Sequence, residues 1–220
     1  HSLFNDDALL RAAWLSFRIA AMTATAAVII GTWAGYVLSR MGRFRGFALY
    51  VGMLSAPLVI PEVVLGISLL LMFVELRGSL GWPAENGIFT IWVGHVTLCM
   101  AFVAVVIQTR IRDLDRSLEE AALDLGATPM TVFFKITLPL IAPALASAWL
   151  LSFTLSLDDV VLASFLSGPS SSTLPMEVFS RVRLGLKPEI NALATLFILA
   201  VGTCVILANR LQWRKESEPK

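Results

Sequence analysis

Residues 86–109 read NGIFTIWVGHVTLCMAFVAVVIQT, a stretch of 24 residues without a formal charge when His95 is counted as neutral. A helix crosses the ~30 Å hydrocarbon core of a bilayer with about 20 apolar residues. Water is absent from that core, so a spanning segment has to satisfy its own backbone hydrogen-bonding groups, and an α-helix does this within one segment. The stretch therefore predicts a membrane-spanning α-helix.

Four more stretches of the chain are similarly long and apolar. They cover residues 19–39, 46–74, 136–157 and 190–209, and the second of them contains a single charge, Glu62. We predict five spans in an all-α, polytopic membrane helical bundle, with residues 1–220 forming one transmembrane domain.

The composition agrees with a membrane protein. Hydrophobic residues make up 57% of the 220 residues, charged residues make up 15%, and the net charge is +1. Soluble domains have about 45–50% apolar and about 25% charged residues. The low charge excludes a disordered chain and a basic nucleic-acid-binding domain. Cys99 and Cys204 both lie in apolar stretches, which indicates buried free thiols rather than a disulfide framework.

Sequence motifs for catalysis are absent. The chain contains no phosphate-binding G-x-x-x-x-G-K-[ST] pattern, so we expect it not to hydrolyse ATP. No Cys and His residues have the spacing of a zinc site. An acid pair of Glu62 and Asp158 across two helices is the one arrangement that an intramembrane enzyme would use, and no other feature supports it. We predict a protein without enzymatic activity, catalytic residues or a metal site.

The basic residues in the connections are unevenly divided between the two sides of the membrane. Eleven lie on the side of the connection 110–139 and six lie on the other side. Lys and Arg concentrate in cytoplasmic loops, so we expect this connection and the C-terminus to be cytoplasmic and the N-terminus to lie outside. Because the chain begins with His1 rather than Met, we also expect an upstream segment, such as another span, to be missing.

This longest cytoplasmic connection has a local pattern of its own. Ser117 and Glu120 have the spacing of a capping box, which predicts a helix with Ser117 at its N-cap. Gly126 predicts the end of that helix, because glycine readily adopts the left-handed backbone of the C′ position. Thr128, followed by a proline at the first helical position, predicts a second short helix that Pro139 ends.

Both predicted helices have an apolar face. The first face consists of Leu118, Ala121, Ala122 and Leu125, and the second consists of Val132, Phe133 and Ile136. Helices this short are unstable alone in water, so each face needs a partner. Two alternatives are open: the loop folds back on its own bundle, or it binds another chain.

The loop resembles that of a known family. Its pattern is Glu120-Ala121-Ala122, three residues, Gly126, nine residues, Ile136, one residue and Leu138-Pro139, which matches the EAA loop of importer-type ABC transporter permeases at each signature position. The resemblance implies a type I ABC importer permease fold with a cytoplasmic EAA coupling loop over residues 110–139. In that family the loop docks into a groove of the ATPase subunit.

The resemblance also implies which residues couple the chain to the ATPase. They are Glu120, Ala121, Ala122, Gly126, Thr128, Ile136, Leu138 and Pro139. For Glu120 two roles remain open, because a capping function alone would also explain a glutamate at this position.

Further segments are similar to the permeases of spermidine/putrescine importers, in particular to their second, PotC/PotI-like subunit. These segments are residues 56–62 (APLVIPE), 156–159 (SLDD) and 188–195 (PEINALAT). The resemblance implies a multi-pass protein of the bacterial inner membrane that translocates polyamines by alternating access. Members of this family have six spans, so here the first span is expected to be missing.

The same resemblance implies the partners of the chain. They are a second homologous permease subunit, a dimer of ATP-binding subunits that carries ATP and Mg²⁺, and an extracytoplasmic polyamine-binding protein. The chain itself is expected to hold no cofactor and to bind no nucleic acid.

Three acids lie inside or at the end of predicted spans. A charge at the bilayer centre costs ~2.5–3.5 kcal/mol on insertion scales, so Glu62, Asp158 and Asp159 are candidates for a functional role. At ~1.5 Å per helical residue, all three lie in the outer half of the membrane, where they would line a vestibule for a cationic substrate. Aromatic faces would add cation–π contacts there, and the candidates are Trp149, Phe153 and Phe165.

A salt bridge is the alternative explanation for the acids. Arg18 lies at the outer end of the first predicted span and would neutralise Asp158 or Asp159. Consecutive residues point ~100° apart on a helix, so one aspartate would contact substrate while the other pairs within the chain. His95 is expected to be a packed, hydrogen-bonded helix residue.

Two other functions remain as alternatives. An ABC permease for another small solute, such as an anion, a sugar or another cation, would have the same loop with a different vestibule. A secondary carrier driven by an ion gradient would transport without an ATPase, and a coupling loop would have no purpose in it.

Overall fold

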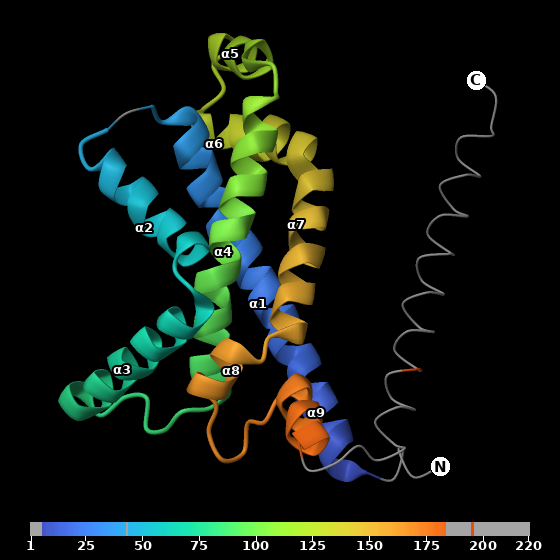
Figure 1. The fold of residues 1–220 in the computed structure, drawn as a ribbon. Helices are drawn as coiled ribbons and strands as arrows, with labels where there is room; N and C mark the ends of the chain where they lie inside the picture. The colour runs from blue at the N-terminus through green and yellow to red at the C-terminus, as the bar shows by residue number, and fades with distance from the viewer. Residues whose placement is uncertain (1–5, 43, 184–194, 196–220) are drawn as a thin grey trace. The chain divides into compact units, whose positions relative to one another are not determined.

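The computed structural model describes residues 6–42, 44–183 and 195. Within these residues it contains helices and no strand (Figure 1), which confirms the all-α fold class. The helices are α1 (Asp7–Arg40), α2 (Phe47–Val59), α3 (Glu62–Leu80), α4 (Ile88–Arg112), α5 (Arg116–Asp124), α6 (Pro129–Val132), the π-helix η2 (Phe133–Thr137), α7 (Leu138–Asp158), α8 (Val161–Leu166) and α9 (Leu174–Arg183). Contacts group residues 12–176 into one compact part and the residues on either side into a second. Each part is described by itself.

Four helices in the described ranges are long and apolar enough to cross a membrane. They are α1, α3, α4 and the continuous helix Pro129–Asp158, which joins α6, η2 and α7. Three of them confirm the spans predicted at residues 19–39, 86–109 and 136–157. The span predicted at residues 190–209 lies outside the described residues.

The bounds of the span predicted at residues 46–74 are wrong, because the chain breaks between α2 and α3 and the helix long enough to span is α3. Ile60 has extended backbone with ψ 130°, and Pro61 follows it directly before α3. A proline disfavours helical backbone at the preceding residue, and its missing N–H is tolerated where a helix starts. α3 leaves the break in a different direction from α2 (Figure 1). With 13 residues, α2 is too short to span a bilayer alone.

α4 is the centre of the larger part, where it packs against α7, α2 and α8. α1 also approaches α4 closely at two glycines. A Cβ atom at Gly31 would lie 2.6 Å from the Cβ of Val103, and one at Gly35 would lie 2.8 Å from the carbonyl oxygen of Ala104. Small residues four positions apart allow two membrane helices to pack backbone against backbone. The two glycines therefore fix the contact between α1 and α4.

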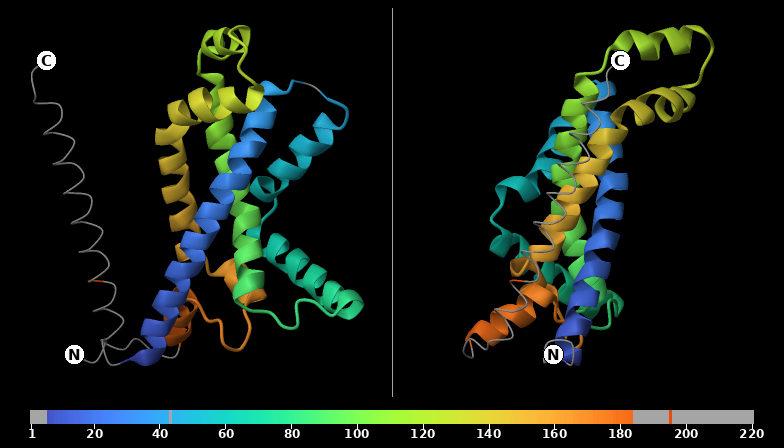
Figure 2. Two further views of the ribbon diagram at one scale, coloured as in Figure 1. Left: turned by 180° about the vertical axis from the view of Figure 1, so that it is seen from behind. Right: turned by 90° about the vertical axis from the view of Figure 1, so that its right-hand side faces the viewer.

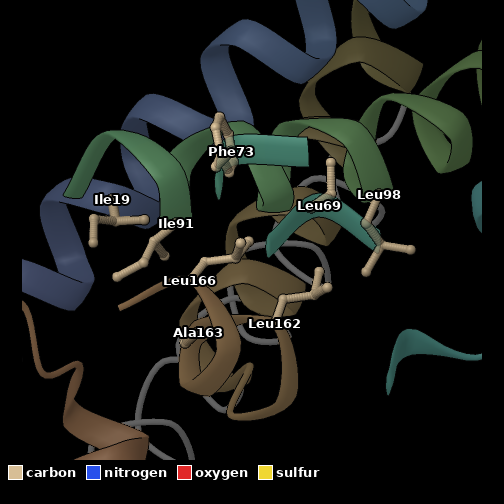
Figure 3. Packing of buried hydrophobic residues seen from close by; sticks show 8 residues of the cluster. All are labelled: Ile19, Leu69, Phe73, Ile91, Leu98, Leu162, Ala163 and Leu166. Carbon is tan, nitrogen blue, oxygen red and sulfur yellow. The ribbon is translucent and has the colours of Figure 1, made fainter. Parts of the chain in front are cut away.

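Among the described residues, three buried clusters include residues of α4, and the smallest consists of Ala34, Leu54 and Ala104. A second joins α1, α3, α4 and α8 (Figure 3), and consists of Ile19, Leu69, Phe73, Ile91, Leu98, Leu162, Ala163 and Leu166. This cluster holds the short helix α8 against α3. The third joins α1, α4 and α7, and includes Ile107, Ile141 and Cys99. Cys99 is a buried free thiol, as predicted, whereas Cys204 lies outside the described residues.

The smaller part is described at residues 6–11 and 177–183. Arg181 of α9 donates hydrogen bonds to both carboxylate oxygens of Asp6 and to the carboxylate of Glu177. The hydrogen bond from Arg181 is the main cause that lowers the pKa of Asp6 to about 2. The same ion pair raises the pKa of Arg181. An acid before α1 is thus paired with a base at the end of α9.

Candidate functional site

α5, in the first half of the loop between α4 and α7, lies beyond the ends of α1 and α4 in both views of Figure 2. The N-cap of α5 lies two residues before the predicted one. Asp115 has extended backbone, and its Oδ1 accepts a hydrogen bond from the Ser117 N–H at 2.9 Å. Hydrogen bonds from the backbone and the side chain of Ser117 lower the pKa of Asp115. A carboxylate also interacts favourably with the positive end of the helix dipole, which a hydroxyl does not.

The capping-box prediction for Ser117 and Glu120 is therefore wrong. With Asp115 as the N-cap, the third helical position is Leu118, and Glu120 lies beyond it. Glu120 is exposed and makes no capping contact. Of the two roles left open for Glu120, capping is excluded and contact with another chain remains.

The turn after α5 confirms that Gly126 ends this helix and that Thr128 caps the next one. Gly126 has φ +87°, its N–H donates to the carbonyl of Leu123, and the Ala127 N–H donates to the carbonyl of Ala122. These two bonds form a Schellman motif, which requires a left-handed residue at C′. Thr128 then caps α6, because its Oγ1 accepts from the Thr131 N–H at 3.3 Å.

The prediction that Pro139 ends the second helix is wrong, because the chain stays helical from α6 into α7. Residues 133–137 form the π-helix η2, in which the Leu138 N–H donates to the carbonyl of Phe133, five residues earlier. A proline has no N–H to donate and its ring crowds the preceding turn. The wide π turn accommodates Pro139 in the first turn of α7 without a break.

Aromatic rings attach η2 to α1. Phe133 is buried, stacks on Trp33 with a centroid distance of 4.6 Å, and meets Tyr36 edge-on at 4.9 Å. Stacked and edge-to-face pairs of this kind add stability beyond the burial of their area. The second half of the loop is therefore fixed to the end of a span.

The outer surface of the loop is exposed and carries apolar side chains among polar ones. α5 has no buried residue, and Leu118 and Leu125 are 50% and 90% exposed. Ala121 and Gly126 are exposed as well. Exposed apolar surface at the end of a bundle is typical of a surface that another protein covers. In the described chain the bundle does not bury Leu118 and Leu125, which is not what the alternative of a loop folded back on its own bundle predicts for this face.

The other predicted coupling residues lie in the second half of the loop. Thr128 and Pro139 are exposed, whereas Ile136 and Leu138 are half-buried on the helix that continues into α7. Glu120 and Ala121 are thus exposed on α5, and Gly126 is exposed directly after it. Ala122 is half-buried.

Sequence analysis missed the ion pair that holds α5. Glu119 Oε2 lies 2.7 Å from Nε of Arg40, the last residue of α1. Thr137 Oγ1 donates to the other carboxylate oxygen of Glu119 at 2.8 Å. No signal in the sequence links residues 79 positions apart, and the incorrect N-cap directed attention to Glu120.

Asp159 makes its contacts within the chain. It is the C-cap of α7, and its Oδ1 accepts a hydrogen bond from the Ala163 N–H of α8 at 2.9 Å. The same oxygen lies 3.4 Å from Nε2 of His95, whose Nδ1 lies 2.7 Å from Ser156 Oγ. His95 is 2% exposed, which confirms its prediction as a packed, hydrogen-bonded residue. The pairing of an aspartate with Arg18 is wrong, since Asp159 lies against His95 instead.

Asp158 and Glu62 are the exposed acids of the predicted vestibule. Asp158 is the last residue of α7 and Glu62 is the first residue of α3, and neither has an ion-pair partner in the described chain. A Cβ atom at Gly66, one turn after Glu62, would meet the ring of Phe165 at 2.7 Å. α3, which begins at Glu62, therefore packs against α8, which follows α7 and Asp158 in the chain.

Of the aromatic residues predicted along the vestibule, Phe165 packs against Gly66 of α3. Trp149 and Phe153 stack on each other with a centroid distance of 5.3 Å. They line the contact between α7 and α1, where the Trp149 Nε1–H donates to Thr25 Oγ1 at 3.2 Å. In the described ranges no group of three or more His, Cys, Asp or Glu side chains is placed to hold a metal ion.

An all-helical membrane bundle with an exposed helical turn at one end is the architecture of an importer permease subunit. The chain belongs to the family of binding-protein-dependent transport system inner membrane components, whose family model matches residues 27–216. It is 60% identical over 216 residues to the Putrescine transport system permease protein PotI of Escherichia coli (strain K12), covering 98% of this chain and 77% of that protein. It is 41% identical to the Spermidine/putrescine transport system permease protein PotC of the same strain, covering 98% and 79%.

Two solved structures share the fold. A chain of the MetNI methionine ABC transporter, in inward facing conformations, has a TM-score of 0.73 at 18% identity and covers 92% of this chain and 94% of that chain. A chain of a bacterial ABC transporter involved in the import of the acidic polysaccharide alginate has a TM-score of 0.69 at 17% identity, covering 99% and 82%. These likenesses confirm the type I ABC importer permease fold. The chain is a permease component of the inner membrane and not a catalytic subunit.

Proposed function

We propose that this chain is one permease subunit of an ATP-driven importer for polyamines such as spermidine and putrescine. The similarity along nearly the whole chain to permeases named for these substrates carries the proposal. By alternating access, the subunit opens a path first to the outside and then to the cytoplasm. Partners shift that equilibrium only by binding the two states with different affinity.

The exposed acids fit a cationic substrate. A polyamine carries several ammonium groups separated by methylenes, so it requires carboxylates that are spaced apart and unpaired. Asp158 and Glu62 meet both conditions at the ends of two different helices. Asp159 contacts His95 and the Ala163 N–H within the chain. Its role is to stabilise the break between α7 and α8.

The exposed turn of α5 fits an ATPase subunit. Leu118, Leu125 and Ala121 present an apolar surface, and Glu120 adds beside it a charge without an ion-pair partner among the described residues. A short amphipathic helix of this kind binds in a groove of its partner. ATP and Mg²⁺ belong to that partner, and this chain transmits the movement.

The remaining parts of the complex follow from the same proposal. A second homologous permease subunit completes the path, a dimer of ATP-binding subunits docks at the loop 110–139, and an extracytoplasmic polyamine-binding protein delivers the substrate. The loop and the C-terminus face the cytoplasm, as the excess of Lys and Arg on that side predicts.

Uptake by the reconstituted complex tests the proposal. Proteoliposomes with ATP inside receive labelled putrescine or spermidine together with the binding protein. Accumulation that needs ATP supports the proposal, and ATP hydrolysis without polyamine uptake would point to a permease for another solute. Accumulation driven by an ion gradient without an ATPase would identify a secondary carrier.

The acids are tested in the same assay with Asp158→Asn and Glu62→Gln. Loss of uptake in either variant, with normal assembly, supports a substrate contact at that residue. Asp124→Asn is the matched control, because Asp124 is an exposed carboxylate of α5 without an ion-pair partner in the described chain. If both acid variants transport as well as this control, the vestibule proposal fails.

A further inference from the structure

Two adjacent glutamates of α5 have different surroundings. Glu120 is exposed and belongs to the outer surface of the loop. Glu119 has only 13% of its side chain exposed and is paired with Arg40, whose side chain is 10% exposed. The coupling pattern of the loop includes Glu120 and assigns no role to Glu119.

The Glu119 carboxylate is bound from two directions. Arg40 Nε lies 2.7 Å from Oε2, and Arg40 Nη2 donates to Oε1 at 3.3 Å. Thr137, which is fully buried, donates its hydroxyl to Oε1 at 2.8 Å. We call these three residues, Arg40, Glu119 and Thr137, the Glu119 clamp. A shielded ion pair with an added hydrogen bond holds its geometry better than an exposed pair, which contributes little.

The clamp joins three segments of the chain. Arg40 ends α1, Glu119 lies in the middle of α5, and Thr137 ends η2 and leads directly into α7. A weaker bond from Arg116 Nη2 to the Ser39 carbonyl, at 3.4 Å, runs between the same two helices α5 and α1. π-Helical turns are rare and are frequently found at functional sites.

We propose that Glu119 is a positioning residue, which locks α5 to the ends of α1 and of the helix that continues into α7. The exposed surface of α5 and these two spans then move as one body when the ATPase moves the loop. This inference rests on the proposed function of the loop. Without the clamp, α5 stays bound to the ATPase through its exposed surface, but its movement is no longer passed fully to the spans.

The test compares Glu119→Gln with Asp124→Asn in the complete reconstituted complex. Glu119→Gln keeps the shape of the side chain and an acceptor for Thr137 but removes the charge that pairs with Arg40. Asp124→Asn makes the same chemical change on the same helix at an exposed position without an ion-pair partner in the described chain. Asp124 is not one of the predicted coupling residues and does not belong to the apolar face of Leu118, Ala121, Ala122 and Leu125. The readout is the amount of putrescine transported per ATP hydrolysed. Residues that carry coupling between sites change it by about two- to thirty-fold, and we expect a decrease in this range for Glu119→Gln and none for Asp124→Asn.

Two further variants keep the inference falsifiable if Glu119→Gln does not assemble. Thr137→Val removes only the hydroxyl that binds Glu119, and we expect a smaller decrease in the same ratio. Exchanging the charges, with Arg40→Glu and Glu119→Arg together, restores an ion pair and is expected to recover part of the ratio. If Glu119→Gln or Thr137→Val assembles and couples as well as Asp124→Asn, the positioning role is wrong.

Hydrogen exchange of α5 separates this inference from the proposed function. In the purified full chain, we expect the backbone amides of residues 116–124 to exchange faster in Glu119→Gln than in Asp124→Asn. Equal exchange in the two variants would overturn the clamp whatever the substrate is. If Glu119→Gln exchanges faster than Asp124→Asn but the parent complex takes up no polyamine, only the proposed substrate is overturned.

Discussion

His95 Nδ1 lies 2.7 Å from Ser156 Oγ, in a buried position between α4 and the last turn of α7. The other ring nitrogen of His95 lies 3.4 Å from Asp159 Oδ1, directly after that turn. His95 of α4 therefore contacts a residue in the last turn of α7 and the residue directly after that helix. This contact fixes the helix break that leaves Asp158 exposed.

Removing the hydroxyl at Ser156 is expected to destabilise the protein. Ser156→Ala leaves a buried ring nitrogen of His95 without its partner, and such a loss costs about 1–3 kcal/mol. The matched control is Ser147→Ala on the same helix, where the exposed hydroxyl bonds only to the carbonyl of Pro143 one turn earlier. The midpoint of thermal unfolding in detergent is the measurement. Equal midpoints for the two variants would show that the His95 contact contributes nothing.

A methyl group at Gly31 is expected to force α1 away from α4. The added Cβ would lie 2.6 Å from the Cβ of Val103, and overpacking of this kind costs about 1–3 kcal/mol. Gly52→Ala in α2 is the control, because nothing lies within 4 Å of its added Cβ. There the better helix propensity of alanine should stabilise the helix slightly. We expect Gly31→Ala to lower the unfolding midpoint and Gly52→Ala not to. A reversed order would contradict the close packing of α1 and α4.

The left-handed backbone of Gly126 predicts a graded response to substitution. At φ +87° a β-branched side chain is strained, and a left-handed residue costs roughly 1–2 kcal/mol. Asparagine tolerates this backbone better than other residues with a side chain. Gly126→Val should therefore reduce ATP-dependent uptake with normal membrane insertion, and Gly126→Asn should retain more activity. The measurement is the ATP-dependent uptake of each variant, divided by the amount of that variant inserted in the membrane. Equal activity of the two variants would argue against a required turn.

The ion pair of Asp6 and Arg181 predicts a defined dependence of stability on pH. The pKa of Asp6 is lowered from 3.8 to about 2 in the folded chain. A lowered pKa means that the contribution to stability is complete above pH ~4 and disappears as the pH falls through the folded value. The difference in unfolding midpoint between the parent and Asp6→Asn should thus be constant from pH 7 to pH ~4 and shrink toward pH ~2. A difference that grows on acidification would contradict the pairing.

The spans at 19–39, 86–109 and 136–157 were predictable because freedom from charge over ~20 residues is a local property of the sequence. The roles of Gly126 and Thr128 were predictable for a similar reason, since a cap depends on residues within one turn. The break at Pro61 was only half predictable. A proline indicates that a helix is disturbed, but the new direction of α3 depends on its packing against α8.

The contacts that sequence analysis missed depend on how the helices are arranged in the fold. Asp115 and Ser117 are both good N-caps, and choosing between them requires knowing where α4 ends. The partner of Asp159 was sought in Arg18, whereas the turn of the chain after Asp158 directs Asp159 toward His95 on α4. Arg40 and Glu119 meet only because the fold places α5 beside the last residue of α1.

The central claim is that the exposed turn of α5 drives polyamine import, and ATP-dependent putrescine uptake by the Leu125→Asp complex tests it most directly. Leu125 is 90% exposed, so a charge there leaves the fold intact but spoils an apolar docking surface. The control is Leu80→Asp, at a leucine 75% exposed at the end of α3. We predict that vesicles with Leu125→Asp contain the subunit but accumulate no putrescine, whereas Leu80→Asp vesicles accumulate it like the parent. Equal accumulation by Leu125→Asp and the parent would contradict the account.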